Sequence, residues 1–533
     1  MKTEKNNIHK VSYIMDILLI LILLVISIGA FYIAYTFQMI PMKWIHYAGV
    51  ISIIIWIVLL LLTMKKIPLW ARIIRRIFII LLCTCFSTTG FLLHKSKNVL
   101  DKISTTTVHK DGTVTQKNKL YIIVLKDSDI NNISELSQTT VGYQNGTDKE
   151  NASFIKTQLE KEVSNVLSVE ELDYTTLINS LQNGNIQALA ISQSFYNMSC
   201  ATITGFKDKV KILTTYEKEV KKEVSTKDIS KEPFTIYISG LDSMGSPDQQ
   251  TRTDTNLLLI VNPRSNHIDM VSLPRDGLMP NAALNNSNDK LTHTGIYGID
   301  ASVETIQNFY GIPIDFYARV SFNSVIEIVD SIGGIDVDVE ISFCEQDENR
   351  SFAKDDLICL VKGEQTLNGK QALAYSRHRK TEGYDNAGRQ RAQQRIIKAI
   401  ISKLISPNAI SYVNNLMEIA PNYIITNMPS NQISNFVSSE LESLKPWTIS
   451  SIATDYGVFD SRYVASLDAS YGLVDVYLFN KEEVQNVLNA YDGASKQLQL
   501  NNFTFDVNNL YENSPTINND PNIIWDTMAD FPH

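Results

Sequence analysis

The stretch Arg252–Asp276 reads RTDTNLLLIVNPRSNHIDMVSLPRD, and it sets two apolar runs around a polar turn. The runs TNLLLIVNP and HIDMVSLP have the composition of β-strands, and the Pro, Ser and Asn residues between them are typical of a turn. Charged residues stand at both outer ends of this pair. Arg252 and Asp254 open the first strand and, being two residues apart, point the same way. Arg275 and Asp276 follow the second strand, so the stretch predicts a strand pair bordered by arginine and aspartate.

Further strands and helices occur on both sides of this pair. Strands are predicted at FTIYISG, IDFYARVSF and GIDVDVEI, from their apolar and β-branched residues. Helices are predicted at GIDASVETIQNFYG, FNSVIEIVDSIGG and Gln393–Leu404, from apolar residues at helical spacing. Because both kinds of element intermingle, residues 234–406 are predicted to form a main domain that is an α/β sandwich. Residues 407–533 are polar and rich in Asn, and we expect an ordered extension that gradually frays.

Residues 120–215 are predicted to form a small α/β accessory domain. This region begins with the strand-like LYIIVL, continues through a Gly-containing turn and reaches an amphipathic helical stretch. The segment LSQTTVGYQNGT resembles the opening of an extracellular solute-binding module, although a spacer domain without a ligand is the preferred interpretation. Polar or charged linkers are expected on either side of the domain, at 100–119 and 216–233.

The first 99 residues contain nearly all of the continuous apolar sequence, in three segments. Ile14–Phe37, His46–Met64 and Ile73–Leu93 each approach the roughly 20 residues that cross a bilayer. Lysine and arginine concentrate before the first segment and between the second and third, and such charge marks the cytoplasmic side. We therefore predict three transmembrane helices over residues 1–99, with the N-terminus in the cytoplasm and the large C-terminal region outside the cell. Asp16, near the cytoplasmic end of the first segment, is expected to be a hydrated flanking residue.

The composition excludes some functions and leaves others open. With 57 acidic and 48 basic residues, the chain has a formal net charge of -9 and no broad basic stripe, which argues against nucleic-acid binding. No Cys and His spacing indicates a zinc site. Cys344 and Cys359 flank a polar stretch that could be a hairpin, and a disulfide between them and two free thiols are equally compatible with the sequence.

Charged residues stand at the ends of four apolar elements of the main domain. They are Asp242 in YISGLDS, Arg252 with Asp254, Arg275 with Asp276, and Arg377 with Arg379 in ALAYSRHR. The last two are expected at the end of a strand, and Arg389 and Gln393 share one face of the following helix. Gathered guanidinium groups need anions, and neighbouring carboxylates need a cation. Oxygen ligands without histidine favour magnesium, so the pattern predicts a site where arginines and Mg2+ hold a pyrophosphate.

The run from Phe234 to Leu404, about a third of the chain, resembles the catalytic domain of the LytR–CpsA–Psr family. The matching motifs, in chain order, are ISGLDS, RTDTNLLLIVNP, VSLPRD, GIPIDFYARVSF, VDSIGGIDVDV, KGEQTLNGKQALAYSRHR and GRQRAQQ. Three N-terminal membrane spans followed by an accessory domain are similar to the capsule-associated, CpsA-type branch of this family.

The resemblance implies a membrane-anchored, extracytoplasmic phosphotransferase of a Gram-positive-type bacterium. Such an enzyme takes a glycopolymer (capsule, teichoic acid or similar) from a polyprenyl-pyrophosphate carrier and joins it to peptidoglycan through a phosphodiester. Two alternatives use the same residues: a pyrophosphatase acting on the polyprenyl-pyrophosphate glycan, and a regulator that binds lipid phosphates without turnover. The oligomeric state and the identity of the glycopolymer stay open.

The resemblance also implies roles for individual residues. Asp242 and Asp254 correspond to the magnesium ligands. The residues that correspond to the pyrophosphate-binding set are Arg252, Arg275, Lys290, Arg377, Arg379, Arg389 and Gln393, of which Arg275, Arg377, Arg379 and Arg389 correspond to the catalytic residues. Asp276 is expected to anchor Arg275. Asp385 is a second supporting residue, displaced by one position because Asn386 stands where many relatives have aspartate.

Overall fold

A computed structural model of the chain describes residues 2–495, with short gaps. The gaps are 66, 105–112, 147, 224, 226, 242–246, 248–249, 348–350, 352, 385, 405, 407–409, 444, 453–456 and 467–471. Two predicted site residues, Asp242 and Asp385, therefore lie outside the described residues. The chain divides into two compact units, the first made of Met1–Thr105, Asp228–Ser230 and Met428–Pro446, and the second of the remaining residues. Each unit is described by itself.

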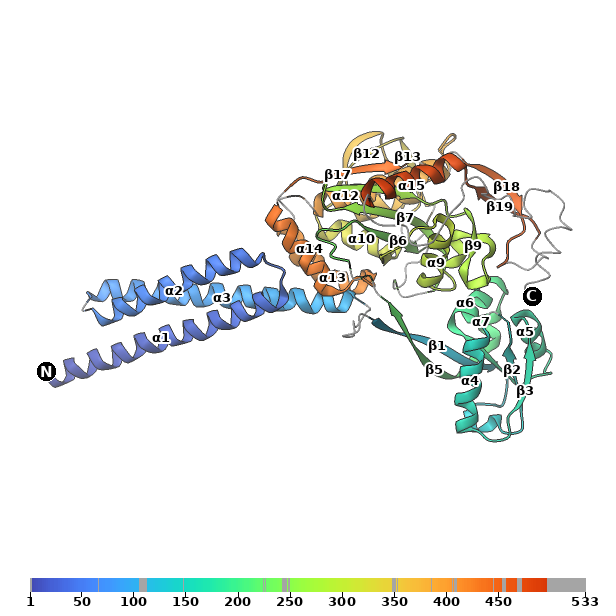
Figure 1. Cartoon of the computed structure of the whole chain (residues 1–533), viewed down its shortest axis with the longest axis horizontal. Coiled ribbons are helices and arrows are strands. Elements are labelled where there is room, and N and C mark those ends of the chain that lie inside the picture. Colours follow the sequence, from blue (N-terminus) through green and yellow to red (C-terminus); the bar gives the residue numbers. More distant parts are fainter. Residues whose placement is uncertain are drawn as a thin grey trace. The chain divides into compact units, whose positions relative to one another are not determined.

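The first unit is built from long helices (Figure 1). They are α1 (Lys2–Phe37), α2 (Met42–Met64), α3 (Leu69–Ile103) and the later α14 (Ser430–Ser443). Three of them contain apolar stretches long enough to cross a bilayer, over Ser12–Phe37, Met42–Met64 and Leu69–Lys102. The three predicted apolar helices are thereby confirmed, with α3 longer than expected.

Asp16 was predicted to be hydrated, and this prediction was wrong. Its side chain on α1 is 3 % exposed and contacts the guanidinium groups of both Arg75 and Arg76 on α3. The distance from the Nε of Arg76 to a carboxylate oxygen of Asp16 is 2.6 Å. The basic residues that open the third apolar segment therefore neutralise Asp16 and join α1 to α3, as expected for a carboxylate within a membrane helix bundle.

The accessory region forms a five-stranded sheet in the order β3-β2-β4-β1-β5. Its strands are β1 (Thr113–Leu125), β2 (Thr140–Gln144), β3 (Leu167–Glu171), β4 (Ala188–Ser192) and β5 (Val210–Glu223). Its helices are η1 (Ile133–Leu136), α4 (Lys149–Glu162), α5 (Tyr174–Gln182), α6 (Gln193–Thr202) and α7 (Phe206–Lys209). The sheet packs an apolar cluster on each face, so the predicted α/β character is observed.

Both predicted linkers turned out to be partly strand. The second half of 100–119 belongs to β1 and the first half of 216–233 to β5, and these two long strands pair from Thr113 opposite Glu223 onward. Lysine and glutamate face each other across the ladder, as at Lys119 and Glu217. Such opposite-charge pairs stabilise an exposed ladder. In the sequence alone, the same charged residues resemble a solvated linker.

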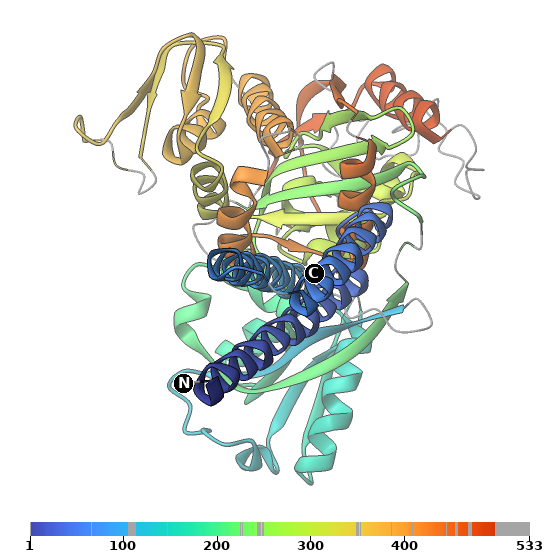
Figure 2. The same ribbon diagram turned by 90° about the vertical axis from the view of Figure 1, so that its left-hand side faces the viewer.

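The main sheet has six strands in the order β16-β11-β6-β7-β8-β17, which lie side by side in Figure 2. The strands are β6 (Phe234–Leu241), β7 (Thr253–Asn262), β8 (His267–Ser272), β11 (Phe316–Val320), β16 (Ile425–Thr426) and β17 (Thr448–Ile452). The strands β6, β7 and β8 are antiparallel, whereas β11 runs parallel to β6 and β17 parallel to β8. The strand pair predicted around the NPRSNH turn is therefore confirmed.

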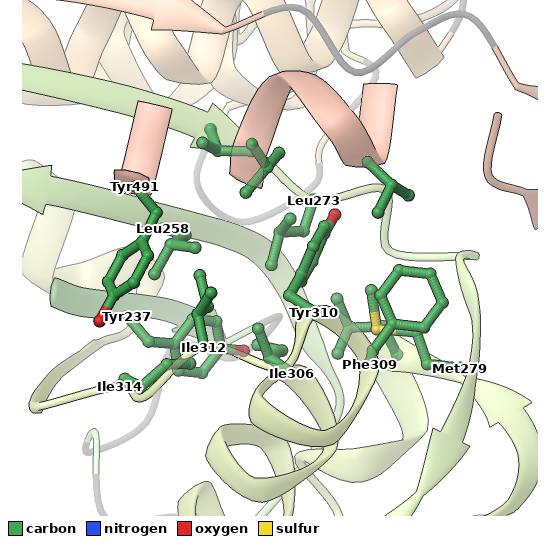
Figure 3. Packing of buried hydrophobic residues seen from close by; sticks show 14 of the residues in the cluster. Tyr237, Leu258, Leu273, Met279, Ile306, Phe309, Tyr310, Ile312, Ile314 and Tyr491 are labelled. Atoms are coloured by element: carbon green, nitrogen blue, oxygen red, sulfur yellow. The ribbon is translucent and has the colours of Figure 1, made fainter. Parts of the chain in front are cut away.

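One side of this sheet is covered by α9 (Ile299–Tyr310) and α15 (Lys481–Ser495). Figure 3 shows Ile306 and Tyr310 of α9 in one cluster with Leu258 and Leu273, and Tyr491 of α15 in the same cluster. Residues of the predicted C-terminal extension therefore enter the core, and those after residue 495 lie outside the described residues. The polar, Asn-rich composition of the extension concealed the few apolar positions that pack.

A second group of elements forms a lobe with its own apolar cluster. Two short ladders pair β12 (Ile335–Val339) with β15 (Gly363–Leu367) and β13 (Phe343–Glu345) with β14 (Ile358–Leu360). The helices of the lobe are α10 (Phe322–Ser331), α11 (Gly369–Arg377), α12 (Asn386–Leu404) and α13 (Ile410–Tyr423). Cys344 and Cys359 stand opposite each other on β13 and β14 and form a disulfide, which decides between the two possibilities that the sequence left open.

The remaining elements lie between β8 and α9 or near the end of the chain. They are β9 (Leu278–Asn281), η2 (Ala282–Leu284), β10 (Ser287–Lys290), α8 (Leu291–Thr294), β18 (Val458–Arg462) and β19 (Val474–Leu478). The backbone N–H of Tyr477 on β19 donates to the carbonyl of Asp276 at 2.7 Å. A segment that follows residue 407 thereby supports the turn that carries Arg275 and Asp276.

Candidate anion-binding site

Arg275 and Asp254 meet at one edge of the main sheet. Because β7 and β8 are antiparallel, with Leu257 opposite Ser272, the start of β7 and the end of β8 lie at the same edge. Nη1 of Arg275 donates to one carboxylate oxygen of Asp254 at 2.5 Å, and the hydroxyl of Thr292 donates to the other at 3.2 Å. The charged residues at the two outer ends of the predicted strand pair are therefore brought into contact.

Asp276 is shared between two cations. Nζ of Lys290 lies 3.1 Å from a carboxylate oxygen of Asp276, and Nε of Arg275 lies 3.9 Å from the same oxygen. Lys290 is the last residue of β10, which pairs with β9 directly after the Asp276 turn. Asp276 thus pairs first with Lys290, and its contact with Arg275 is the longer of the two.

Arg389, in the first turn of α12, adds a buried cation to this group. Its side chain is 7 % exposed. Burial lowers the pKa of the Arg389 guanidinium, the positive charges of Arg275 and Arg379 lower it further, and the carboxylates of Asp254 and Asp276 act in the opposite direction. Arg389 therefore interacts electrostatically with Arg275, Arg379, Asp254 and Asp276. Arginine stays protonated even so.

The glycine before Arg389 allows this placement. A Cβ at Gly388 would lie 2.6 Å from the ring of Tyr384, which is buried in the lobe. Only glycine lets the start of α12 approach that ring so closely. In the GRQRAQQ motif, the glycine therefore allows close packing on Tyr384, and the arginine that follows it supplies the buried cation.

Two nitrogen atoms of the group lack a hydrogen-bond acceptor among the described residues. The Nε–H groups of Arg275 and Arg389 are both buried and donate to no hydrogen-bond acceptor among the residues that the structure describes. A buried N–H group without an acceptor is costly. The arrangement is therefore suited to an anion whose oxygen atoms would accept these hydrogen bonds.

Arg377 ends a helix and not a strand, so that expectation was wrong. The run ALAY is too short for periodicity to separate the two, and it forms the last turns of α11. The Arg377 guanidinium donates to the carbonyl of Asp347 at 3.2 Å and lies over the ring of Phe322. Gln393 on α12 is buried and donates to the carbonyl of Ser376 at 3.2 Å, so it holds the end of α11.

The predicted magnesium ligands are only partly described. Leu241, the last residue of β6, pairs with Thr253, so the ladder ends one residue before Asp242 and beside Asp254. Arg252 is exposed just ahead of β7. Within the described part of the chain, no three His, Cys, Asp or Glu side chains gather as a metal site. The magnesium site stays a prediction.

Sequence reasoning missed three residues at this site. Thr292 contacts Asp254, and a lone threonine carries no sequence signal of such a role. His378, between Arg377 and Arg379, is buried and lies 2.9 Å from a carboxylate oxygen of Glu345. The Arg-His-Arg run was visible in the sequence, but Glu345 lies 33 residues earlier and only the fold joins them.

The accessory domain fills its own sheet edge with protein groups. The Asp148 carboxylate, after β2, accepts from the hydroxyl of Tyr174 at 2.6 Å and from the backbone N–H of Ser192, at the end of β4, at 3.3 Å. Burial raises the pKa of the Asp148 carboxyl group. The position where parallel strands usually offer a ligand site is thus occupied by side chains and backbone of the accessory domain itself.

The comparison with protein families covers more than half of the chain. The model of the LytR_cpsA_psr family matches residues 199–490. The chain belongs to the LytR_cpsA_psr family. In this family member, the match extends past residue 407 and includes β17, β19 and most of α15, in agreement with their place in the sheet and core.

Curated relatives from Bacillus subtilis (strain 168) match the same region of this LytR_cpsA_psr protein. The polyisoprenyl-teichoic acid–peptidoglycan teichoic acid transferase TagU is 35% identical over 208 residues, which cover 39% of this chain and 63% of TagU. The transferase TagV is 32% identical over 227 residues, covering 41% of this chain and 57% of TagV. The chain thus matches less than two thirds of either relative. The crystal structure of TagV covers 50% of this chain, with 27% identity and a TM-score of 0.41.

Proposed function

We propose that this membrane-anchored chain is a phosphotransferase that moves a glycopolymer from a polyprenyl-pyrophosphate carrier to peptidoglycan and forms a phosphodiester. One observation carries the proposal: the cations around Arg389 outnumber the carboxylates. The four cations are Arg275, Lys290, Arg379 and Arg389, and the two carboxylates are Asp254 and Asp276. Four minus two leaves an excess of two positive charges within these six groups, and the two buried Nε–H groups there lack acceptors among the described residues.

A pyrophosphate fits this excess better than a carboxylate or a neutral sugar. Its several oxygen atoms carry more than one negative charge, and the planar fork of arginine binds two phosphate oxygens at once. The names of the relatives TagU and TagV, polyisoprenyl-teichoic acid–peptidoglycan teichoic acid transferases, support a lipid-linked donor and a peptidoglycan acceptor. Both substrates are part of the proposal for this chain.

In phosphoryl transfer, the main contributions of the protein are to position the reacting groups and to neutralise the charge on the phosphates. A peptidoglycan hydroxyl forms the new bond to the phosphorus atom nearer the glycan, and the bridging P–O bond breaks. Polyprenyl phosphate leaves with the bonding electrons, and the hydroxyl proton passes to the leaving phosphate or to water. Arg275 and Arg389 stabilise the charge that grows on the leaving phosphate, and Arg377 and Arg379 complete the binding site from the α11 side.

Magnesium belongs to the proposal as a cofactor. The described residues offer one suitable carboxylate, Asp254, whose oxygens already contact Arg275 and Thr292, and the second predicted ligand, Asp242, follows the end of β6. Oxygen donors alone agree with the preference of Mg2+. When bound, the ion would neutralise phosphate oxygens.

We further propose that the chain belongs to the capsule-associated, CpsA-type branch, since three apolar helices and an accessory α/β sheet precede its main sheet. The positive charges beside the apolar segments support an N-terminus in the cytoplasm and a site outside the cell. The core and sheet contacts of β17 and α15 support adding these two elements to the proposed catalytic domain 234–406. Capsule polymer and teichoic acid are both candidate cargo.

The deciding experiment incubates the full chain in detergent micelles with a polyprenyl-pyrophosphate glycan, peptidoglycan and Mg2+. Glycan attached covalently to peptidoglycan supports the transferase. Release of free phosphorylated glycan without attachment indicates a pyrophosphatase, and bound but unchanged donor indicates a regulator. Arg275→Ala should abolish attachment. Arg391→Ala, on the partly exposed Arg391 that pairs with Glu340 at 2.9 Å, is the matched control.

A further inference from the structure

His378 lies between two of the proposed pyrophosphate-binding arginines but points into the protein. Arg377 ends α11, and His378 follows as its extended C-cap, with φ -63 and ψ 134. The ring of His378 is 2 % exposed and stacks on the ring of Phe343, with 4.1 Å between the centroids. Because side chains alternate along extended backbone, Arg379, which follows His378, points away from that core and is exposed.

Both nitrogen atoms of His378 are engaged. Nδ1 lies 2.9 Å from a carboxylate oxygen of Glu345, and Nε2 lies 2.8 Å from the hydroxyl of Thr381. Burial raises the pKa of the Glu345 carboxyl, but hydrogen bonds from the Gln346 backbone and from His378, with the charge of Lys380, bring the pKa below its ordinary value. The carboxylate is therefore ionised, so Nδ1 of His378 carries a proton and donates it.

Glu345 itself stands on a rigid support. It is the last residue of β13 and directly follows Cys344, whose disulfide to Cys359 closes the β13–β14 ladder. The backbone N–H of Gln346 donates to the second carboxylate oxygen of Glu345 at 3.0 Å, which fixes the orientation of the carboxylate.

The same strand end also holds Arg377. Its guanidinium donates to the carbonyl of Asp347 at 3.2 Å and lies 3.5 Å from the side-chain oxygen of Gln346. The residues 345–347 thus contact two consecutive residues of the Arg-His-Arg run, one through its imidazole and the other through its guanidinium.

We propose that Glu345 and His378 form a positioning pair that sets the direction of Arg377 and Arg379 toward the pyrophosphate. The inference rests on the proposed function and deepens it. Neither Glu345 nor His378 needs to touch the substrate. A misplacement of about 1 Å at a reacting centre costs about 100-fold in rate. A histidine with a fixed side chain between two arginines would limit such misplacement of the arginines.

The test measures the binding of farnesyl pyrophosphate to the full chain in detergent micelles by calorimetry. His378→Asn keeps a donor near the place of Nδ1, whereas His378→Leu has a similar volume and no donor. We expect His378→Leu and Glu345→Gln each to weaken binding about tenfold, the size expected for a charge-assisted hydrogen bond, and His378→Asn to lose about threefold at most. Each single substitution already breaks the hydrogen bond between Glu345 and His378. The double variant Glu345→Gln/His378→Leu should therefore bind no more weakly than His378→Leu alone.

Glu340→Gln is the matched control. It removes a carboxylate from the same lobe, paired with Arg391 and Arg395, and should leave binding unchanged. Equal binding by the Asn and Leu variants, or additive losses in the double variant, would overturn the positioning pair. Wild-type affinity in Glu345→Gln, with binding abolished by Arg275→Ala, overturns the pair and leaves the proposed function intact. No binding by the wild-type protein overturns both. Melting temperatures of all variants show which of them are folded and can be compared, and Glu345→Gln carries the test if His378→Leu does not fold.

Discussion

The carboxylate of Asp254 and the guanidinium of Arg275 are joined at 2.5 Å across the edge of the main sheet, although 21 residues separate them in the chain. The contact neutralises Arg275 in the protein without ligand. A bound pyrophosphate would have to share Arg275 with Asp254, unless a cation takes the carboxylate over.

Asp254→Asn distinguishes two proposed effects of the Asp254 carboxylate, which are competition with pyrophosphate for Arg275 and binding of Mg2+. Without divalent cations, farnesyl pyrophosphate should bind the variant at least as tightly as the wild-type protein, because its phosphates no longer compete for Arg275. Addition of Mg2+ should tighten wild-type binding by about tenfold, or about 1.4 kcal/mol, and leave the variant unchanged. Calorimetric titration measures both. Asp269→Asn, which removes a carboxylate paired with His267 on β8, is the control, and a full Mg2+ response in Asp254→Asn would refute the role of Asp254.

Arg389→Lys keeps a positive charge but loses the planar fork and the buried Nε–H group. We expect transfer activity and pyrophosphate affinity to fall by about tenfold or more, since a charge-assisted bidentate contact is lost. Arg391→Lys on the same helix alters a partly exposed ion pair with Glu340 and a contact with the Tyr384 ring, and it should have little effect. Similar losses in both variants would mean that the fork of Arg389 has no special role.

Gly388→Ala tests the close approach of α12 to Tyr384. The added Cβ would lie 2.6 Å from the Tyr384 ring, so the helix start must shift, at a cost of about 1–3 kcal/mol in the free energy of unfolding. Displacement of Arg389 should also weaken pyrophosphate binding. Gly493→Ala on α15 meets nothing within 4 Å and should stabilise the chain by about 0.5–1 kcal/mol. Denaturant unfolding of both variants measures the difference, and equal stabilities would contradict the packing argument.

The double substitution Cys344→Ser/Cys359→Ser opens the β13–β14 ladder. The two cysteines are 15 residues apart, and closing a loop of this length contributes about 3 kcal/mol by the chain-entropy estimate. The free energy of unfolding should fall by about this amount, and a reductant should reproduce the loss in the wild-type protein. Cys200→Ser, at a free cysteine, should change neither value. Insensitivity of the wild-type protein to reductant would show that the bridge adds no stability.

Glu345 should make the stability of the chain sensitive to acid. Its pKa in the folded protein lies below the ordinary value of 4.5, despite burial, because of Gln346, His378 and Lys380. A carboxyl group with a lowered pKa contributes stability that is complete above the unfolded pKa and is lost as the pH falls through the folded pKa. The stability difference between the wild-type protein and Glu345→Gln should therefore shrink as the pH falls below 4.5. If the stability difference between the two proteins does not change with pH, the charge of Glu345 does not stabilise the folded protein.

Much of the fold could be predicted from local pattern. The strands around the NPRSNH turn and the helices of α9 and α10 have strong apolar periodicity and clear glycine or proline limits, so local sequence decided them. Prediction failed where local signals were weak. The short ALAY run was assigned to a strand although it ends helix α11, and the charged run before Glu223 was assigned to a linker although β1 pairs with it.

The residue types and their order by themselves determined the family, the three apolar helices and the set of arginines and aspartates, because these are properties of chain composition and spacing. The tertiary structure alone decided which charges meet. It paired Arg275 with Asp254, buried Arg389 beside them, and placed Glu345 against His378. These contacts join residues that are 21 and 33 positions apart, and such distances are closed only by the register of the sheet and the packing of the lobe.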